Sequence, residues 1–575
     1  MENYYLDNSD IQFYMKHMDM NEVIRLIEDD FADVDVFDYA PRNVEEAKEN
    51  YQMVLSALGE ICAEQIAPTA AEADEQGAQF WEGQVIYALA TQKAMKLLKD
   101  AQLTGFTLPR KYGGLNFPNT IYSIAIEMVS QAEAGLQNIF GLQEIAATIN
   151  EFADEETKLK YLPRFSSGEI TGAMVLTEPE AGSDLQKVQL KAFYDEEEGC
   201  WRLKGNKRFI TNGNADVALI LARSESGTSD GRGLSMFVYE RDETVVVRRI
   251  ENKLGIHTSP TCELQFNNTK AVLVGKRRMG LVRYVMSLMN GARLGIACQA
   301  IGIAQAAYNE ALKYAEDREQ FKKKILDMPL VYDMLVRMKM KIEAARVLTY
   351  ETSLIVDKKK AYDAILEREK SADKDVKKRA KELNAMANIL TPLSKYYASE
   401  IANQVAYDAI QIHGGTGYMR EFNVERHYRD ARITNIYEGT TQLQVVASIG
   451  GVITRTLDPE YERLMKLIEN SEQSKHVGRL KDCHGRILEA VDYVKKLDDS
   501  EYQSYYSENL VAMEADLYIA LQQMYYARFA DHKRIMAEQF LEHAEKNSRY
   551  HHDVITSGNR TVIENYRKIL YEEKS

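Results

Sequence analysis

Residues 433–444 read ITNIYEGTTQLQ, and this stretch places one carboxylate, Glu438, between two expected helices. Gly439 allows a sharp turn directly after that carboxylate, because glycine reaches backbone conformations that other residues avoid. Thr441 and Gln444 have the spacing of a capping box, which predicts that a helix begins there. Backbone amides at a helix start can also bind a ligand oxygen or a phosphate. Taken alone, a glutamate beside a glycine is most often a solvated loop residue, so the surrounding motifs decide its interpretation.

Two further motifs precede this stretch. Residues 411–417 read QIHGGTG, and Arg429-Asp430 follows before Tyr437–Thr440, which reads YEGT. In order and spacing, the three motifs resemble the signature of the acyl-CoA dehydrogenase family. The resemblance implies a flavoprotein enzyme with FAD as its cofactor and an acyl-CoA thioester as its substrate. It also implies that Glu438 is the catalytic base.

The resemblance extends beyond these motifs. Gly255–Cys262, Leu273–Gly275 and Met289–Gly295 look closest to long bacterial members of the family, which carry extensions at both ends. That subgroup includes methylthiopropionyl-CoA dehydrogenases and broad-range fatty acyl-CoA dehydrogenases. The resemblance therefore covers nearly the whole chain, and it is most specific over residues 172–444.

Length and composition limit the classes of protein that fit. The 575 residues exceed one ordinary hydrophobic core, so we expect three or four domains. The net charge of −15 argues against a nucleic-acid partner, because such proteins present a basic face. The five cysteines form no C-x-x-C pair, so neither a disulfide framework nor a metal site is expected.

The N-terminal residues and the hydropathy pattern bear on the compartment. Residues 1–20 are acidic and contain no apolar run, whereas a transit peptide is rich in arginine and poor in acid. No segment has the roughly 20 uninterrupted apolar residues that a membrane span requires. The sequence therefore predicts a cytoplasmic protein without a membrane span.

Changes in the period of apolar residues predict the domains. Apolar residues recur at helical spacing before about residue 168, whereas Cys262–Phe266 alternates as a half-buried strand does. We expect an α+β protein with an N-terminal helical domain, a central β-barrel or sandwich, a four-helix bundle and an additional C-terminal helical domain. The expected ranges are an extension at 1–45, then domains at 46–168, 169–275, 276–457 and 458–575.

Two expectations concern the helical region after the sheet. Asp327 and Pro329 look like the start of a long helix that reaches Val356. The charged residues of Asp357–Lys381 are interpreted as a solvated connection between helices of the bundle.

Two segments resemble the flavin-binding loops of the family. Residues 177–184 read TEPEAGSD after an apolar strand, where Thr177 can hydrogen-bond the edge of a flavin ring and Ser183 can meet a phosphate. Residues 207–213 read KRFITNG, with Phe209 at a position where the family commonly has tryptophan. The structural alternatives are a plain strand-to-turn junction for the first segment and barrel core for Phe209.

A third set of residues is expected to reach the FAD of a partner subunit. Arg318 resembles the arginine of the family's Arg-x-x-Phe segment and suits a pyrophosphate. Pro329 and Lys322 stand where the family commonly has glutamine and glycine, so the sequence departs from the pattern here. Taken together, the residues that the resemblance assigns to FAD are Met174, Leu176, Thr177, Gly182, Ser183, Phe209, Thr211, Arg318, Gln320, Phe321, Gln411, Gly414, Gly415, Thr440 and Gln442.

The substrate contacts follow from the same resemblance. Some branches of the family place the base just before the arginine equivalent to Arg293, but this chain has Ala292 there, which leaves Glu438 as the carboxylate. A structural salt bridge is the alternative role for Arg293. The residues assigned to the substrate are Ser183, Asn290, Arg293, Tyr437 and Gly439.

The expected reaction is α,β-dehydrogenation of an acyl-CoA to the trans-2-enoyl-CoA. Glu438 removes the α-proton, FAD N5 accepts the β-hydrogen as hydride, and an electron-transferring flavoprotein receives the electrons. The alternatives are an acyl-CoA oxidase that uses oxygen and a non-catalytic subunit that binds flavin or CoA. Because part of the FAD site comes from a partner subunit, we expect a homo-oligomer, and the C-terminal extension favours a homodimer.

Overall fold

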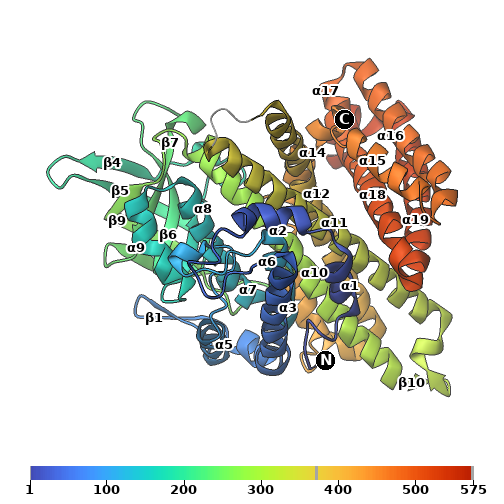
Figure 1. Ribbon diagram of the computed structural model, residues 1–575, viewed down its shortest axis with the longest axis horizontal. Coiled ribbons are helices and arrows are strands. Elements are labelled where there is room, and N and C mark those ends of the chain that lie inside the picture. The colour runs from blue at the N-terminus through green and yellow to red at the C-terminus, as the bar shows by residue number, and fades with distance from the viewer. Residues whose placement is uncertain (1, 369–372, 572–575) are drawn as a thin grey trace. The chain divides into compact units, whose positions relative to one another are not determined.

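The computed structural model describes residues 2–368 and 373–571, and the chain divides into two compact units. The first unit comprises Met1–Leu335 and Ile401–Glu438, and the second comprises Val336–Glu400 and Gly439–Ser575. Helices precede and follow a central sheet, which confirms the expected α+β class (Figure 1). The domain boundaries expected from the sequence stay a prediction.

The first unit begins with helices that enclose a buried helical core. Almost every side chain of α6 is buried, and α6 packs against both α7 and the long helix α10, Met286–Asp317. The elements before the sheet are α1 Ser9–His17, α2 Asn21–Ile27, α3 Val44–Glu60, α4 Ala70–Gln76, β1 Gln79–Trp81, β2 Gln84–Ile86, α5 Leu89–Asp100, α6 Asn119–Ala132, α7 Ala134–Gly141, α8 Ile145–Phe152 and α9 Glu155–Ser166.

The N-terminal extension contains two helices, α1 and α2. Asn8 caps α1, since its side-chain oxygen accepts hydrogen bonds of 3.1 Å from the amides of Asp10 and Ile11. Phe13 and Met15 are buried, so packing stabilises this short helix.

The central sheet closes on itself. Strand β6 pairs with β4 and β7, β9 pairs with β5 and β7, and β4 pairs with β5, so these strands form a ring. The ring corresponds to the barrel of the two expected alternatives, with β3 and β8 added at its sides. The strands are β3 Gly172–Val175, β4 Lys191–Asp195, β5 Cys200–Thr211, β6 Val217–Arg223, β7 Leu234–Glu240, β8 Val245–Ile250 and β9 Thr261–Leu273.

Alternation along β6 explains why the sheet has a core on each face. Leu219 and Leu221 join a hydrophobic cluster that includes residues of α8 and α9, while Ala218, Ile220 and Ala222 join the cluster inside the ring. Side chains of a strand point alternately to its two faces, so an uninterrupted apolar run suits a strand buried on both.

The expected helix from Pro329 is α11, Pro329–Arg368, which extends well beyond Val356. The next helix, α12, is Lys374–His413. The charged run was therefore wrongly interpreted as a connection, because helix continues into it from both sides, while residues 369–372 lie outside the described residues. Lysine and glutamate are good helix formers, and spacings such as Lys359 to Asp363, 2.8 Å between Nζ and Oδ2, support the exposed helix.

The second unit contains most of α11 and α12 together with the C-terminal helices. Leu517, Leu521 and Met524 of α18 are fully buried, and α18 packs against α14, α15, α16 and α19 (Figure 1). The remaining helices are α13 Val424–Thr434 of the first unit, and α14 Thr441–Ile453, α15 Asp458–Glu469, α16 Val477–Leu497, α17 Ser500–Tyr505, α18 Ser507–Tyr526, α19 Asp531–Thr556 and α20 Thr561–Leu570 of the second.

None of the helices within residues 2–368 and 373–571 combines the length and the apolar character needed to cross a lipid bilayer. All five cysteines are free. In the same part of the chain, no group of three or more potential metal-ligating side chains comes together.

A buried ionic cluster joins the two segments of the second unit. The Lys533 ammonium donates to the Glu343 carboxylate, and Arg346 Nη1 lies 3.4 Å from Glu343 Oε2. All three side chains are almost completely buried. Removing one partner from such a cluster leaves charge without compensation in a medium of low dielectric constant.

We predict that Glu343→Gln lowers the stability of the protein by about 3–5 kcal/mol, because two buried cations lose their carboxylate. Urea unfolding followed by circular dichroism measures this loss. Lys546→Met is the matched control, since its pair with Glu542 is exposed and should change stability by about 0.5 kcal/mol or less. Equal effects of the two substitutions would contradict the assigned role of the cluster.

Candidate functional site

Glu438 occupies a strained turn at the end of the first unit. Its backbone φ is 54°, in the left-handed region that residues with a side chain rarely adopt, and Gly439 follows with φ 91°. The glycine is needed there, because two successive residues of this turn have positive φ. The turn directs the chain from α13 into α14, and the carboxylate stands between these helices as the sequence predicted.

The capping box expected at Thr441 is wrong by one residue. Thr440 is the N-cap of α14, and its side-chain oxygen accepts a hydrogen bond of 3.4 Å from the Leu443 amide. Gln444 instead donates from Nε2 to the Gly439 carbonyl, 2.8 Å away. The left-handed turn places Thr440 in the extended conformation that an N-cap requires, so the helix starts with that residue.

The structure brings two of the predicted residues, Arg293 and Asn290, together near the Glu438 carboxylate. Arg293 is 7% exposed, and its Nη1 donates to Asn290 Oδ1 at 3.3 Å. Burial lowers the pKa of the Arg293 guanidinium, while the nearby negative charge of Glu438 acts in the opposite direction. Within the described part of the chain, Arg293 forms no ion pair shorter than 4 Å and its Nε has no hydrogen-bond partner. A tight structural salt bridge is therefore not what holds this guanidinium.

The two predicted flavin loops meet through Lys207. The Lys207 ammonium is completely buried, donates to the Leu176 carbonyl at 2.6 Å, and lies 3.0 Å from Glu178 Oε1. The Arg208 amide donates to the Thr177 carbonyl at 3.0 Å. Burial lowers the pKa of Lys207 to about 8, and Glu178 opposes this change. These contacts align the loop after β3 with the middle of β5.

Phe209 lies at an irregularity of β5, where the pairing with β9 shifts register between Lys207 and Ile210. Its φ is 58° and its side chain is 51% exposed, with the Arg208 guanidinium 4.6 Å from the ring centroid. The structural alternative of barrel core is therefore wrong. Thr211, two residues further along the strand, is half-buried.

The first of these two loops has open space beside its backbone at Gly182. Met174 and Leu176 pack into the core, whereas Gly182 and Ser183 are exposed. A Cβ added at Gly182 would meet no atom within 4 Å. A bound molecule can therefore approach the backbone of this loop closely.

A second group of predicted residues gathers at the end of α10. Arg318, Gln320 and Phe321 lie on an exposed hairpin formed by β10, Glu319–Gln320, and β11, Lys323–Lys324, with Phe321 89% exposed. One turn before Arg318, the Tyr314 ring stacks on His413 with centroids 4.3 Å apart. Gln411, at the end of α12, and Gly414 and Gly415, directly after it, flank His413 in the chain, and all three are exposed.

The last predicted contacts belong to the second unit. Gly439 and Thr440 are half-buried, and Gln442 is exposed in the first turn of α14. The Gly439 carbonyl also accepts a hydrogen bond from the buried Lys395.

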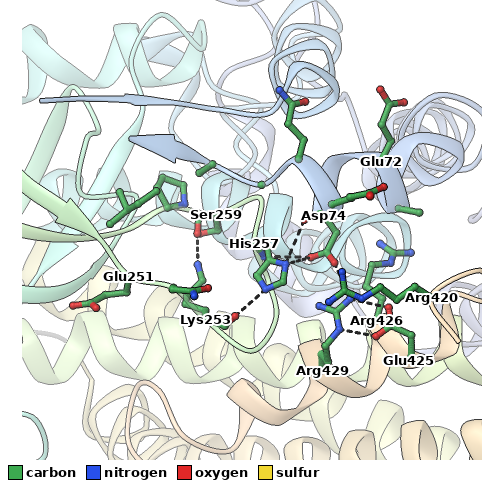
Figure 2. Close-up of a pocket in the computed structure, with 18 of the residues that line it drawn as sticks. Glu72, Asp74, Glu251, Lys253, His257, Ser259, Arg420, Glu425, Arg426 and Arg429 are labelled. Atoms are coloured by element: carbon green, nitrogen blue, oxygen red, sulfur yellow. Dashed lines mark hydrogen bonds and ion pairs between the residues drawn. The ribbon is translucent and has the colours of Figure 1, made fainter. Parts of the chain in front are cut away.

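A cavity of about 600 Å³ lies elsewhere in the first unit, and none of the predicted site residues lines it (Figure 2). His257 Nδ1 is 3.1 Å from Asp74 Oδ1, and its Nε2 is 2.9 Å from the Lys253 carbonyl. Arg429 Nη2 donates to Asp74 Oδ2 at 2.8 Å, and the same guanidinium donates two hydrogen bonds to the Glu425 carboxylate. These paired charges join α4, the loop before β9 and α13, so the cavity wall serves the fold.

Electrostatics around this wall agree with a structural role. The Asp74 carboxylate raises the pKa of His257, because both ring nitrogens face oxygen atoms and each can donate in the protonated form. Burial raises the pKa of Asp430 to about 7, although its Oδ1 accepts a hydrogen bond of 2.6 Å from the Ile256 amide. The Arg429-Asp430 motif therefore connects elements of the first unit.

The sequence analysis gave no role to two buried residues that hydrogen-bond predicted site residues, Lys207 to Leu176 and Gln299 to Tyr437. Lys207 was read only as part of a motif, and Gln299, which is fully buried on α10, received no role. A lysine two residues before the aromatic Phe209, and so on the same face of an expected strand, was the available signal for the first. Gln299 gave no local signal, because its partners come from distant segments of the chain.

Models of the acyl-CoA dehydrogenase N-terminal, middle and C-terminal domains match residues 48–169, 173–269 and 282–449. The 3-methylmercaptopropionyl-CoA dehydrogenase of Ruegeria pomeroyi is 32% identical over 448 residues, which are 73% of each chain.

Two solved structures extend the comparison. Butyryl-CoA dehydrogenase from Megasphaera elsdenii is 31% identical with a TM-score of 0.60, covering 70% of this chain and 98% of the other. An acyl-CoA dehydrogenase from Bacillus anthracis in complex with FAD is 23% identical with a TM-score of 0.73, covering 88% of each chain. At that identity the second likeness shows the fold alone, but it reaches further along this chain.

We predict that Lys207→Met weakens retention of the expected flavin and lowers stability by about 2–4 kcal/mol, because Glu178 stays buried without its cation. Flavin absorbance of the purified protein and its melting temperature report the two effects. Lys204→Met on the same strand is the control, since Lys204 is exposed. Unchanged flavin content in the Lys207 variant would show that the two loops keep their alignment without this contact.

Proposed function

Since the chain belongs to the acyl-CoA dehydrogenase family, we propose that it oxidises an acyl-CoA thioester to the trans-2-enoyl-CoA with Glu438 as the base. Membership of the family establishes that the protein is an acyl-CoA dehydrogenase, an oxidoreductase that uses FAD. The assignment of Glu438 is ours, and one observation carries it: a carboxylate held in a left-handed turn near the buried guanidinium of Arg293. Backbone strain of this kind clusters at functional sites.

The residues present fit a flavin. Phe209 is an exposed aromatic residue on a strained bulge, which a bound aromatic ring would cover. Gly182, Gly414 and Gly415 face open space, so a Cβ would project into a void at each position. Thr177 and Ser183 supply hydroxyl groups to the first loop, and Arg318 supplies an exposed cation that suits a pyrophosphate.

When bound, FAD supplies the acceptor for the hydride that leaves the β-carbon. Glu438 accepts the α-proton, so its carboxylate must reach the α-carbon from the side opposite the flavin. The negative charge that develops on the thioester oxygen needs hydrogen-bond donors, and the Glu438 amide is a candidate because the turn presents this backbone.

Arg293 supports the proton transfer electrostatically. A buried guanidinium near the base favours the ionised carboxylate before the reaction. Because Arg293 also hydrogen-bonds Asn290, its position is limited, and both residues were assigned to the substrate by the sequence.

An acyl-CoA oxidase and a flavin- or CoA-binding assembly subunit remain the competing functions. An anaerobic titration with a panel of acyl-CoAs of different chain length, branching and thioether content tests them together. Loss of oxidised-flavin absorbance with one or more of these compounds supports the proposal. Oxygen consumption in the aerobic reaction favours the oxidase, in which case an electron-transferring flavoprotein is not the acceptor.

We predict that Glu438→Gln keeps FAD and binds acyl-CoA, but that the acyl-CoA no longer reduces the flavin. The amide preserves the shape of the side chain and cannot accept the proton, so the rate should fall by at least about 10³-fold. Stopped-flow absorbance under anaerobic conditions measures this rate.

Dithionite provides the control for this variant, since it reduces a flavin without a protein base. Reduction by dithionite together with no reduction by acyl-CoA locates the defect at the proton transfer. Rapid reduction of the variant by acyl-CoA would remove Glu438 from the mechanism.

We also propose that the protein is a homodimer in which each FAD is shared. The exposure of Arg318 and Phe321 supports this, because residues assigned to FAD stand on an exposed hairpin at the end of α10. We predict that Arg318→Ala loses FAD more readily without loss of helix content, while Lys323→Ala on the same hairpin does not. Light scattering on the FAD-loaded protein gives the mass, and a fully flavinylated monomer would rule out the shared site.

A further inference from the structure

The left-handed conformation of Glu438 must be held by its surroundings. A residue with a Cβ loses about 1–2 kcal/mol in this conformation relative to the ordinary helical region. An unsupported turn would therefore relax and move the carboxylate. The residue directly before Glu438, Tyr437, is the one that the first unit fixes most firmly.

Tyr437 ends in a buried hydrogen-bond network. Its hydroxyl donates to Gln299 Oε1, and Asn138 Oδ1 lies 3.2 Å from the same hydroxyl. Burial strongly raises the pKa of the Tyr437 hydroxyl, so it keeps its proton and acts as a donor. The network thereby attaches the catalytic turn to α10 and α7.

The orientation of the Gln299 amide is fixed by its other partners. Gln299 Nε2 donates to the Ala134 carbonyl at 2.9 Å and to Asn138 Oδ1 at 3.0 Å. Rotating the amide by 180° would turn its oxygen toward these two acceptors, which is unfavourable. The amide oxygen must therefore face Tyr437, and Gln299 is completely buried, so water cannot replace it.

We propose that Gln299 is a positioning residue for the base: acting through the Tyr437 hydroxyl, it holds Glu438 in the left-handed turn from which the carboxylate reaches the substrate. This inference rests on the proposed role of Glu438. The hydrogen bonds of Gln299 go to Ala134, Asn138 and Tyr437, so it acts on the base through Tyr437. A displacement of Glu438 by about 1 Å is enough to slow a proton transfer about 100-fold.

The test compares Gln299→Met, Tyr437→Phe and the double variant in the FAD-loaded protein. Methionine has a similar length and offers no oxygen, and phenylalanine keeps the ring and removes only the hydroxyl. Tyr112→Phe is the matched control, because it also removes one tyrosine hydrogen bond, 2.6 Å to Glu155 Oε1, in another part of the first unit.

We expect each single variant to reduce its flavin about 10- to 100-fold more slowly with acyl-CoA, with unchanged reduction by dithionite and, in Gln299→Met, an unchanged dissociation constant for the acyl-CoA. The double variant should be no slower than the slower single variant, since both substitutions break one connection. Tyr112→Phe should reduce at the wild-type rate.

Hydrogen exchange provides a readout that does not depend on turnover. Amides of residues 434–440 should exchange about tenfold faster in both Gln299→Met and Tyr437→Phe than in the wild type and the control. A role in stability alone would lower the melting temperature without this local effect and without a change in the reduction rate.

The outcomes separate the two proposals. Wild-type flavin that no acyl-CoA reduces overturns the proposed function and the positioning role with it. Wild-type reduction with rates in both single variants within about twofold of it overturns the positioning role alone. A rate loss that disappears at saturating acyl-CoA would place Gln299 in substrate binding and would also overturn the inference.

Discussion

The contact between the Lys207 ammonium and the Leu176 carbonyl is the constraint on which the site geometry depends most. It lies where the exit of β3 meets the irregular middle of β5, and Glu178 neutralises the buried charge. Without the ammonium, the Leu176 carbonyl would lose its donor and the buried charge of Glu178 would lose its counter-ion, although two backbone amides also donate to this carboxylate. The same contact sets the relative position of Thr177 and Phe209, so one buried cation ties the loop after β3 to β5 and aligns the loops assigned to FAD.

A comparable arrangement holds the turn that carries Glu438, the proposed base. In the first unit, the Tyr437 side chain reaches a buried amide network on α7 and α10. In the second unit, the Gly439 carbonyl accepts hydrogen bonds from Lys395 and Gln444. The two residues that flank Glu438 are thus fixed independently. A strained backbone persists when its neighbours determine it in this way, and its carboxylate then needs little reorganisation before it reacts.

The sequence predicted the elements that are written locally. The alternation in Cys262–Phe266, the start of α11 at Pro329 and the turn at Glu438 follow from side-chain period, proline geometry and glycine, and all three are present. The cap of α14, the helical character of the charged run and the hydrogen bonds of Gln299 were missed for physical reasons. Each depends on contacts between residues far apart in the chain, or on a turn conformation that shifts a helix start by one position, and no local pattern records these. The residue assignments at the site came from resemblance, and the fold could support but not replace them.

The division of the chain has a consequence for its synthesis. The first unit consists of Met1–Leu335 and Ile401–Glu438, so the ribosome releases the first long segment of the second unit before the first unit is complete. α13 and the turn at Glu438 are the last parts of the first unit to be synthesised. α10 is synthesised earlier, so the hydrogen bond between its Gln299 and Tyr437 can form only after residue 437 has emerged. The nascent chain can assemble the ring of strands early, whereas the carboxylate reaches its position only in the closing step. A chain that terminates before residue 438 can therefore possess the barrel and the loops assigned to FAD and still lack the carboxylate of Glu438.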